Sequence, residues 1–402
     1  MVSICRYNHV FTCWPSTPGT HPHRCPAASA WVSILVPTRN RLSFIIPSAI
    51  CSTAFRPIPT GIAAGVTVPC PASPRWRRLL DIPARPPLPG CPPVTDFDPA
   101  VAAAELLTVR DFLRYGVSRF NAAGLVHGHG VTTAHDEAAF LVLETLKLPV
   151  DRLDPYLDAR LTTPERKAVA DIIDARVRTR KPAAYLTKRT YIQGVPFYVD
   201  ERVIVPRSYI GELLFGDLFG GDGFTLVEDP TEVEHVLDLC TGSGCLAILA
   251  AQVFPNAKVD AVDLSAEALE VARINVADHG LEDRVTLFQG DLFAPLKGRK
   301  YDVIITNPPY VSDESMAELP PEYRHEPAMA LAGGGVEGLD IVRKILKQAP
   351  KYLTPEGGLL CEFGTGREAL DAMYPDGEFL WLETADSFGE VFWLTREQLT
   401  EL

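Results

Sequence analysis

A turn with two prolines, Asn307-Pro308-Pro309-Tyr310, follows the apolar run 301–306 and carries the most distinctive chemistry in this sequence. The prolines fix φ and remove two N–H donors, so the Pro308 carbonyl can be held toward a cleft. The Asn307 side chain adds a second acceptor oxygen, and the Tyr310 ring can pack beside a target group. Two acceptors suit the two protons of a planar –NH₂ group. The turn therefore favours a site that aims an amino nitrogen at an electrophile, and the alternative is a strand-end turn without function.

A glycine-containing turn follows an earlier apolar run, residues 236–239. Asp238, Thr241, Gly242 and Gly244 lie within or just after this run. Glycines let the chain turn tightly and let backbone N–H groups approach a ligand. The turn lacks the third glycine of a dinucleotide fingerprint and the Gly-Lys-Ser/Thr of a phosphate loop. We expect a cofactor site here, and the alternative is a plain turn between a strand and a helix.

Two carboxylates follow at the ends of the next two apolar runs. Asp263 ends the run 259–263, and a carboxylate placed about 20 residues after a glycine turn suits two ribose hydroxyls; alternatively, it caps the following helix. Asp291 follows the run 285–288, where its side chain can reach an adenine edge, or where it is simply part of a polar loop. Together with the glycine turn, these residues favour an adenosine-bearing cofactor without a pyrophosphate.

Alternating strands and helices must position these residues. The sequence predicts strands at 236–239, 259–263, 285–288, 301–306 and 358–363, and a closing hairpin at 379–382 and 391–394. Helices are predicted from 246, over 266–278 and over 339–349. This alternation indicates an α/β fold with a mostly parallel sheet and helices on both faces, whose ligands bind at the carboxyl ends of the strands. No cluster with metal-ligand spacing accompanies them, so we expect no metal.

The chain before this sheet has a different periodicity. Apolar residues recur at helical spacing over 104–123, over 136–146 and from Thr163, as the N-cap, to 177. Residues 191–199 and 203–205 then predict the two strands of a hairpin. We expect a helical domain over 98–188, a β-hairpin linker over 189–205 and an α/β domain over 206–402.

The composition changes near residue 94. The chain has 402 residues and a net charge of −13, but residues 1–93 hold nine arginines, no lysine, one acid and 17 of the 35 prolines. They carry a charge of +8, which leaves −21 for the remainder. Such proline content prevents long helices and central strands. We interpret residues 1–97 as a disordered or non-native extension, for example an over-extended reading frame.

Two other interpretations of this extension remain. High Arg and low acid content resemble a transit peptide, although the prolines prevent the amphipathic helix that such a peptide needs. Four side chains could bind zinc, although their spacing fits no standard finger: Cys13, His21, His23 and Cys25.

The glycine turn, the carboxylates and the Asn-Pro-Pro-Tyr turn together resemble the class I S-adenosylmethionine methyltransferases that modify amino nitrogens. Four flanking segments, residues 184–187, 197–203, 205–213 and 322–327, closely resemble the ribosomal-protein branch of the protein N5-glutamine methyltransferases. The release-factor branch reads Pro-Arg-Pro-x-Thr-Glu where this chain has residues 206–211. One departure is Tyr209, where the ribosomal-protein branch usually has proline.

The resemblance implies a Rossmann-like, mostly parallel seven-stranded sheet and S-adenosylmethionine as cofactor, with S-adenosylhomocysteine as product. It implies that residues 98–188 form a substrate-recognition domain and residues 206–402 the methyltransferase domain, with catalytic roles for Asn307, Pro308 and Tyr310. The cofactor-binding residues that it implies are Asp238, Thr241, Gly242, Gly244, Asp263, Asp291 and Asn307. The substrate-binding residues that it implies are Asn307, Pro308, Pro309, Tyr310, Arg207 and Glu326.

The implied substrate is a glutamine of the third large-subunit ribosomal protein, methylated before or during ribosome assembly. Methylation of release factors uses the same chemistry and remains an alternative, as does a non-catalytic assembly factor that retains the fold. A DNA methyltransferase is disfavoured because the ordered part is acidic, and a nicotinamide oxidoreductase because the third glycine is missing. The sequence predicts no membrane-spanning helix, and its ordered cysteines suit a reducing compartment, so we expect a cytoplasmic protein.

Overall fold

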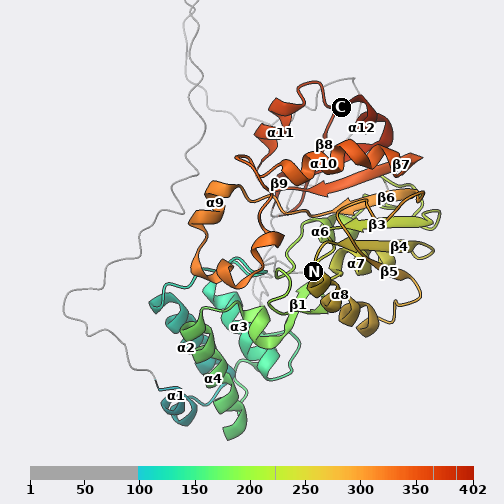
Figure 1. Ribbon diagram of the computed structural model, residues 1–402. Coiled ribbons are helices and arrows are strands. Elements are labelled where there is room, and N and C mark those ends of the chain that lie inside the picture. The colour runs from blue at the N-terminus through green and yellow to red at the C-terminus, as the bar shows by residue number, and fades with distance from the viewer. Residues whose placement is uncertain (1–97, 222, 365, 386) are drawn as a thin grey trace, which may run out of the picture. The chain divides into compact units, whose positions relative to one another are not determined.

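The computed structural model describes residues 98–402 apart from 222, 365 and 386 (Figure 1). The predicted extension, residues 1–97, lies outside the described residues. No described helix is long and apolar enough to cross a membrane.

The first part of the described chain is helical. It contains α1 (Pro99–Glu105), α2 (Val109–Ala122), α3 (Ala134–Thr145), η2 (Asp154–Tyr156), α4 (Thr163–Thr179) and α5 (Ala183–Thr187). We call residues 98–188 the helical unit. Its own hydrophobic core includes the fully buried side chains of Phe112, Phe120, Leu141 and Ile173.

Two predicted boundaries in the helical unit are wrong. The continuous helix predicted over 104–123 is two helices, because Thr108 begins α2 with a capping box: its N–H donates to Asp111 Oδ2 at 2.9 Å, and its hydroxyl accepts from Asp111 N at 3.2 Å. The cap of α4 is Thr162 rather than Thr163, because Glu165 Oε2 accepts from Thr162 N at 2.8 Å.

The predicted hairpin exists, but its turn lies elsewhere. Its strands are β1 (Arg189–Ile192) and β2 (Val195–Tyr198), joined by a two-residue turn. Both turn residues have positive φ, 49° at Gln193 and 76° at Gly194, which matches the twist of a tight hairpin. Residues 203–205 form no strand. Val203 and Val205 are instead buried in a small cluster with side chains of α5 and α8.

A seven-stranded sheet forms the centre of the second part of the described chain, in the order β5-β4-β3-β6-β7-β9-β8. Its strands are β3 (His235–Leu239), β4 (Lys258–Asp263), β5 (Val285–Gln289), β6 (Tyr301–Thr306), β7 (Leu353–Glu362), β8 (Leu380–Glu383) and β9 (Phe388–Thr395). Pairings from β5 to β7 are parallel, and β9 is antiparallel to both neighbours. The predicted mostly parallel seven-stranded sheet is confirmed.

Helices cover both faces of this sheet, as predicted (Figure 1). Alternate residues of one strand enter different cores: Val303 and Ile305 pack with α6 (Ile210–Leu214), α7 (Cys245–Val253) and α8 (Ala266–Asp278), and Ile304 packs on the opposite side. The opposite core includes α10 (Asp340–Gln348), α11 (Arg367–Met373) and α12 (Arg396–Glu401). The remaining short helices are α9 (Asp313–Glu318), η3 (Pro321–His325), η4 (Ala328–Ala330) and η5 (Ala349–Lys351).

The strand order reverses at β3. From β3 the chain proceeds to β4 and β5 on one side and then returns to β6 on the other. Such a switch point opens a crevice at the carboxyl ends of the central strands. The glycine turn follows β3 and the Asn-Pro-Pro-Tyr turn follows β6, so the fold brings the two predicted motifs together at this crevice.

Candidate active site

Two cavities meet at the carboxyl ends of β3 and β6. The larger, about 330 Å³, is lined by Gly242, Asp263, Asp291, Asn307 and Pro309 among others. The smaller, about 210 Å³, is lined by Arg207 and by all four residues of the Asn-Pro-Pro-Tyr turn. Both contain Asn307 and Pro309 in their walls. The larger cavity therefore has four of the seven predicted cofactor residues, the smaller has five of the six predicted substrate residues, and Asn307 lies at their junction.

The glycine turn is held from beneath by Asp238. This carboxylate is fully buried and accepts from Thr241 Oγ1 at 2.5 Å and from Ala247 N at 3.0 Å. Burial raises the pKa of the Asp238 carboxyl to about 7. Gly242 and Gly244 have φ of 55° and 79°, and a Cβ on Gly242 would meet no atom within 4 Å. The backbone at Gly242 is therefore open to a ligand.

The predicted cofactor residues thus divide into two groups. Gly242, Asp263, Asp291 and Asn307 line the larger cavity. The remaining three, Asp238, Thr241 and Gly244, are absent from its lining and shape the turn. Their part in cofactor binding stays a prediction.

Asp263 joins the second strand to the glycine turn. Its Oδ2 accepts from Gly242 N and its Oδ1 from Ser265 N, both at 2.8 Å. The helix cap itself is Ser265, whose hydroxyl accepts from Ala268 N at 3.1 Å. Burial raises the pKa of the Asp263 carboxyl. Each carboxylate oxygen retains a further lone pair, so Asp263 can orient the turn and still accept hydrogen bonds from hydroxyls in the cavity.

Asn307 has its two amide atoms in different surroundings. Its Nδ2 donates to Glu362 Oε1 at 3.0 Å. No donor in the described part of the chain forms a hydrogen bond with its Oδ1. This oxygen does not belong to the buried polar atoms that lack a hydrogen-bond partner. The Glu362 contact therefore fixes which end of the amide is the acceptor, and the side chain can present Oδ1 to a ligand where the cavities meet.

Glu362 is a site residue that the sequence analysis missed. It ends β7, beside β6, and its Oε2 accepts from Ser208 Oγ at 2.6 Å and from Tyr209 N at 2.8 Å. Burial raises the pKa of its carboxyl to about 7. Its position at the end of the strand next to the Asn-Pro-Pro-Tyr strand was the available signal, because such ends converge on ligands. Tyr209, the departure from the family pattern, supplies a backbone N–H that proline would lack.

The predicted substrate residues Arg207 and Glu326 form one ion pair, in which Glu326 is buried and Arg207 is partly exposed. Arg207 Nη1 and Nη2 donate to the two Glu326 oxygens at 2.6 and 2.9 Å, and Glu326 Oε1 also accepts from Val205 N at 2.8 Å. Arg207 lines the smaller cavity, whereas Glu326 is not among its lining residues. The geometry makes Glu326 the group that orients Arg207, and a substrate contact by Glu326 itself stays a prediction.

Comparisons with known proteins identify the family of this chain. The family described as "Methyltransferase small domain" matches residues 225–322. A ribosomal protein uL3 glutamine methyltransferase from Bradyrhizobium diazoefficiens is 60% identical over 301 residues, which cover 74% of this chain and 94% of that protein. This chain belongs to the ribosomal protein uL3 glutamine methyltransferases. Relatives of the same name from Bordetella pertussis and Neisseria meningitidis are 56% and 55% identical over 73% and 74% of this chain, and over 97% and 96% of their own lengths.

Membership of the uL3 glutamine methyltransferases confirms the predicted resemblance, fold class and enzyme class. Among solved structures, a methyltransferase from Pyrococcus furiosus is 19% identical, with a TM-score of 0.38 over 56% of this chain and 97% of that one. A likeness of this size carries no argument about function.

Proposed function

We propose that this protein transfers a methyl group from S-adenosylmethionine to the side-chain amide nitrogen, N5, of a glutamine in ribosomal protein uL3. The observation that carries the proposal is the position of Asn307, which lies at the junction of the two cavities with its amide oriented by Glu362. A methyl donor in the larger cavity and a methyl acceptor in the smaller one would then meet at Asn307, a hydrogen-bonding side chain of fixed orientation.

The larger cavity fits the adenosine half of the cofactor. Asp263 would accept hydrogen bonds from the ribose hydroxyls. Asp291 lines the same cavity as the apolar Leu292, Pro309 and Ile341, which would hold the adenine ring. The open space over Gly242 leaves room for the cofactor next to the glycine turn. When bound, S-adenosylmethionine supplies an electrophilic sulfonium methyl group.

The smaller cavity would hold the glutamine. A carboxamide nitrogen is a poor nucleophile because its lone pair is delocalised into the carbonyl. Asn307 Oδ1 and the Pro308 carbonyl would accept hydrogen bonds from its two N–H groups and turn the nitrogen toward the larger cavity. These hydrogen bonds strengthen as the nitrogen gains positive charge, so they favour the transition state over the ground state. Fixed positioning supplies much of the remaining acceleration, and one proton leaves to water after transfer.

The helical unit would hold the protein substrate outside the cavities, before or during ribosome assembly. We propose the cytoplasm as the compartment, because the substrate is a ribosomal protein.

The test is methyl transfer from labelled S-adenosylmethionine to purified uL3 and purified release factor in parallel reactions. We expect label on one glutamine of uL3, located by mass spectrometry, and at most a trace on release factor. The Asn307→Ala variant is the catalytic control. Preferential label on release factor, or none on either protein, contradicts the proposal.

A further inference from the structure

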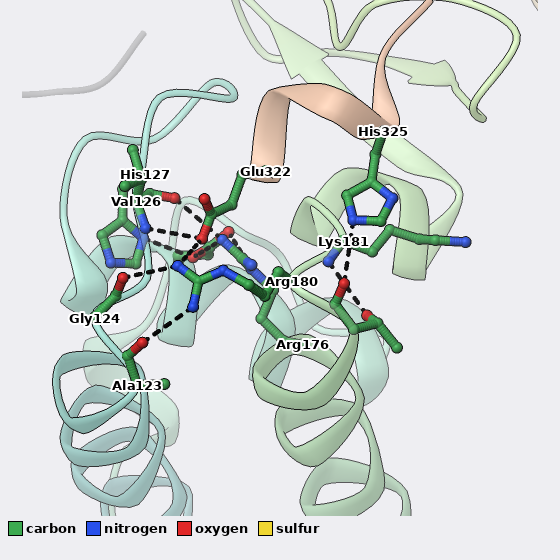
Figure 2. Close-up of polar contacts among 11 residues, drawn as sticks. Ala123, Gly124, Val126, His127, Arg176, Arg180, Lys181, Glu322 and His325 are labelled. Atoms are coloured by element: carbon green, nitrogen blue, oxygen red, sulfur yellow. Dashed lines mark hydrogen bonds and ion pairs between the residues drawn. The ribbon is translucent and has the colours of Figure 1, made fainter. Parts of the chain in front are cut away.

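The segment that follows the Asn-Pro-Pro-Tyr turn contacts the helical unit at η3. Within η3, Tyr323 lines the smaller cavity, so this short helix forms part of the substrate site. Figure 2 shows its neighbours Glu322 and His325 extending toward α4 and the loop after α2. His325 Nε2 lies 3.1 Å from the Thr179 carbonyl oxygen at the end of α4. The wall of the substrate cavity is thus attached directly to the helical unit.

Glu322 makes the main polar contact of this attachment. Its side chain is fully buried, and Oε1 accepts from Val126 N at 3.1 Å and forms an ion pair with Arg180 Nη2 at 2.6 Å (Figure 2). We call Glu322, Arg180 and the Val126 N–H the Glu322 latch. A buried carboxylate depends on such partners, because an isolated buried charge is costly. The latch therefore defines one preferred position of η3 against the helical unit.

The helical unit holds its half of the latch rigidly. Arg176 is fully buried and donates from Nε to Glu137 Oε1 at 2.9 Å and from Nη2 to the Val126 carbonyl at 3.2 Å. Glu137 Oε2 also lies 2.6 Å from His127 Nδ1. Arg180 donates to two further carbonyls of the same loop, those of Ala123 and Gly124 (Figure 2). The loop that offers the Val126 N–H is therefore fixed from both sides.

A second, uncharged contact keeps the same two surfaces in register. The His129 ring packs on Tyr323 with 4.3 Å between ring centroids. Gly128 approaches Tyr323 so closely that a Cβ at this position would lie 2.3 Å from the Tyr323 hydroxyl oxygen. Only glycine permits this approach while Tyr323 keeps its place in the cavity wall.

We propose that Glu322 is a positioning residue for the protein substrate: its latch sets the distance between the helical unit and Asn307, so that uL3 bound to the helical unit presents its glutamine in line for transfer. This inference rests on the proposed function. It assigns to Glu322 the joining of two structural units rather than direct contact with the glutamine. Glu322 has no part in the cofactor cavity, so its effect is confined to substrate presentation.

The first test is steady-state methylation of uL3 by Glu322→Gln at saturating cofactor. We expect kcat to fall about 10- to 100-fold, because displacement of about 1 Å at the reacting atoms has this effect. The KM for uL3 and the Kd for S-adenosylmethionine should stay within about threefold. Glu318→Gln is the matched control, since this exposed residue of the neighbouring α9 makes no ion pair in the described part of the chain. A raised KM with unchanged kcat, or no change in either, overturns the proposal.

The second test moves the same two surfaces apart at the Gly128–Tyr323 contact, without removing a charge. Gly128→Ala should lower kcat for uL3, and adding Tyr323→Phe should restore it to the level of Tyr323→Phe alone, because the nearest ring carbon would then lie 3.4 Å from the new Cβ. This pair also decides the matter if Glu322→Gln fails to fold, as followed by thermal unfolding. Failure of Tyr323→Phe to restore the rate overturns the latch. Failure of the unsubstituted enzyme to label uL3 overturns the proposed function instead.

Discussion

At the residue scale, the two ends of the Asn307 amide have separable tasks, since Nδ2 bonds Glu362 and Oδ1 is left for a ligand. Asn307→Ala should lower kcat about 10²- to 10³-fold, the usual effect of losing one transition-state hydrogen bond. Asn307→Asp should be equally poor, because its carboxylate would face the Glu362 carboxylate and lack the donor that fixes the rotamer. Single-turnover kinetics and calorimetric cofactor binding check this: affinity should change only a few-fold. Near-normal turnover in both variants would exclude the turn from catalysis.

Glu362 should give the reaction a pH dependence. In the described part of the chain its oxygens accept from the Ser208 hydroxyl, the N–H groups of Tyr209 and Ile210, and the Asn307 amide, so the ionised form fits the site. Burial, with a smaller effect of Glu390, raises its pKa to about 7. As the pH falls below about 7 the carboxyl takes a proton, one oxygen becomes a donor facing donors, and kcat should fall.

The Glu362→Gln variant isolates this effect. Its side chain cannot ionise and presents an NH₂ group to the same donors, so kcat should be low and independent of pH between 6 and 8. Rates are measured at saturating cofactor, because the Asp238 carboxyl beneath the glycine turn also has a pKa of about 7. A pH step of unchanged size in Glu362→Gln would assign the titration to another group.

The proposed role of Asp263 is tested by cofactor affinity. Asp263→Ala removes the proposed ribose acceptor and also releases Gly242 N and Ser265 N. Hydrogen bonds to a charged group contribute about 1.5–3 kcal/mol, so affinity for S-adenosylmethionine should fall about 10- to 100-fold in calorimetric titration. Circular dichroism should show an intact fold. Unchanged affinity would limit Asp263 to a structural role.

At the element scale, sequence periodicity predicted the strands of the sheet because their buried residues alternate between two cores. Elements bounded by local hydrogen bonds were predicted less well: the capping box at Thr108 divides a continuous apolar pattern, and the turn at Gln193 and Gly194 lies inside an apparently uninterrupted strand. The partners of Glu362 were beyond prediction for a different reason. Ser208 is 154 residues away, and only the folded sheet brings the two together.

The buried ion pair between α3 and α4 should be the most sensitive point of the helical unit. Arg176→Met leaves Glu137 buried beside His127 without its cation, and breaking such a pair costs about 3–5 kcal/mol. Urea unfolding should show this loss of free energy of unfolding. The matched control is Lys167→Met, whose exposed i,i+4 pair with Asp171 on α4 contributes about 0.5 kcal/mol at most. Equal effects of the two substitutions would contradict the argument.

At the scale of the whole molecule, the described chain joins two units with separate hydrophobic cores. Two contacts between these units, from Glu322 to Arg180 and from Glu326 to His129, fall within one short segment that follows the Asn-Pro-Pro-Tyr turn. The same segment is one of the four that carry the resemblance to the ribosomal-protein branch. We therefore propose that specificity for the protein substrate depends on this segment, which joins the unit proposed to hold uL3 to the cavity proposed to receive its glutamine.

The last prediction concerns the first 93 residues, whose composition differs from that of the rest. The relative from Bradyrhizobium diazoefficiens aligns over 94% of its own length with only 74% of this chain, and every residue of the proposed site lies after residue 200. A chain that begins at Val94 should therefore bind S-adenosylmethionine and methylate uL3 with the kcat and KM of the full chain, measured side by side. The removed part carries +8, so the shortened chain is more acidic, and the comparison is made at two salt concentrations to separate screening from specific loss. Loss of activity or solubility at both salt concentrations would restore the interpretations of this extension as a zinc site or a targeting segment.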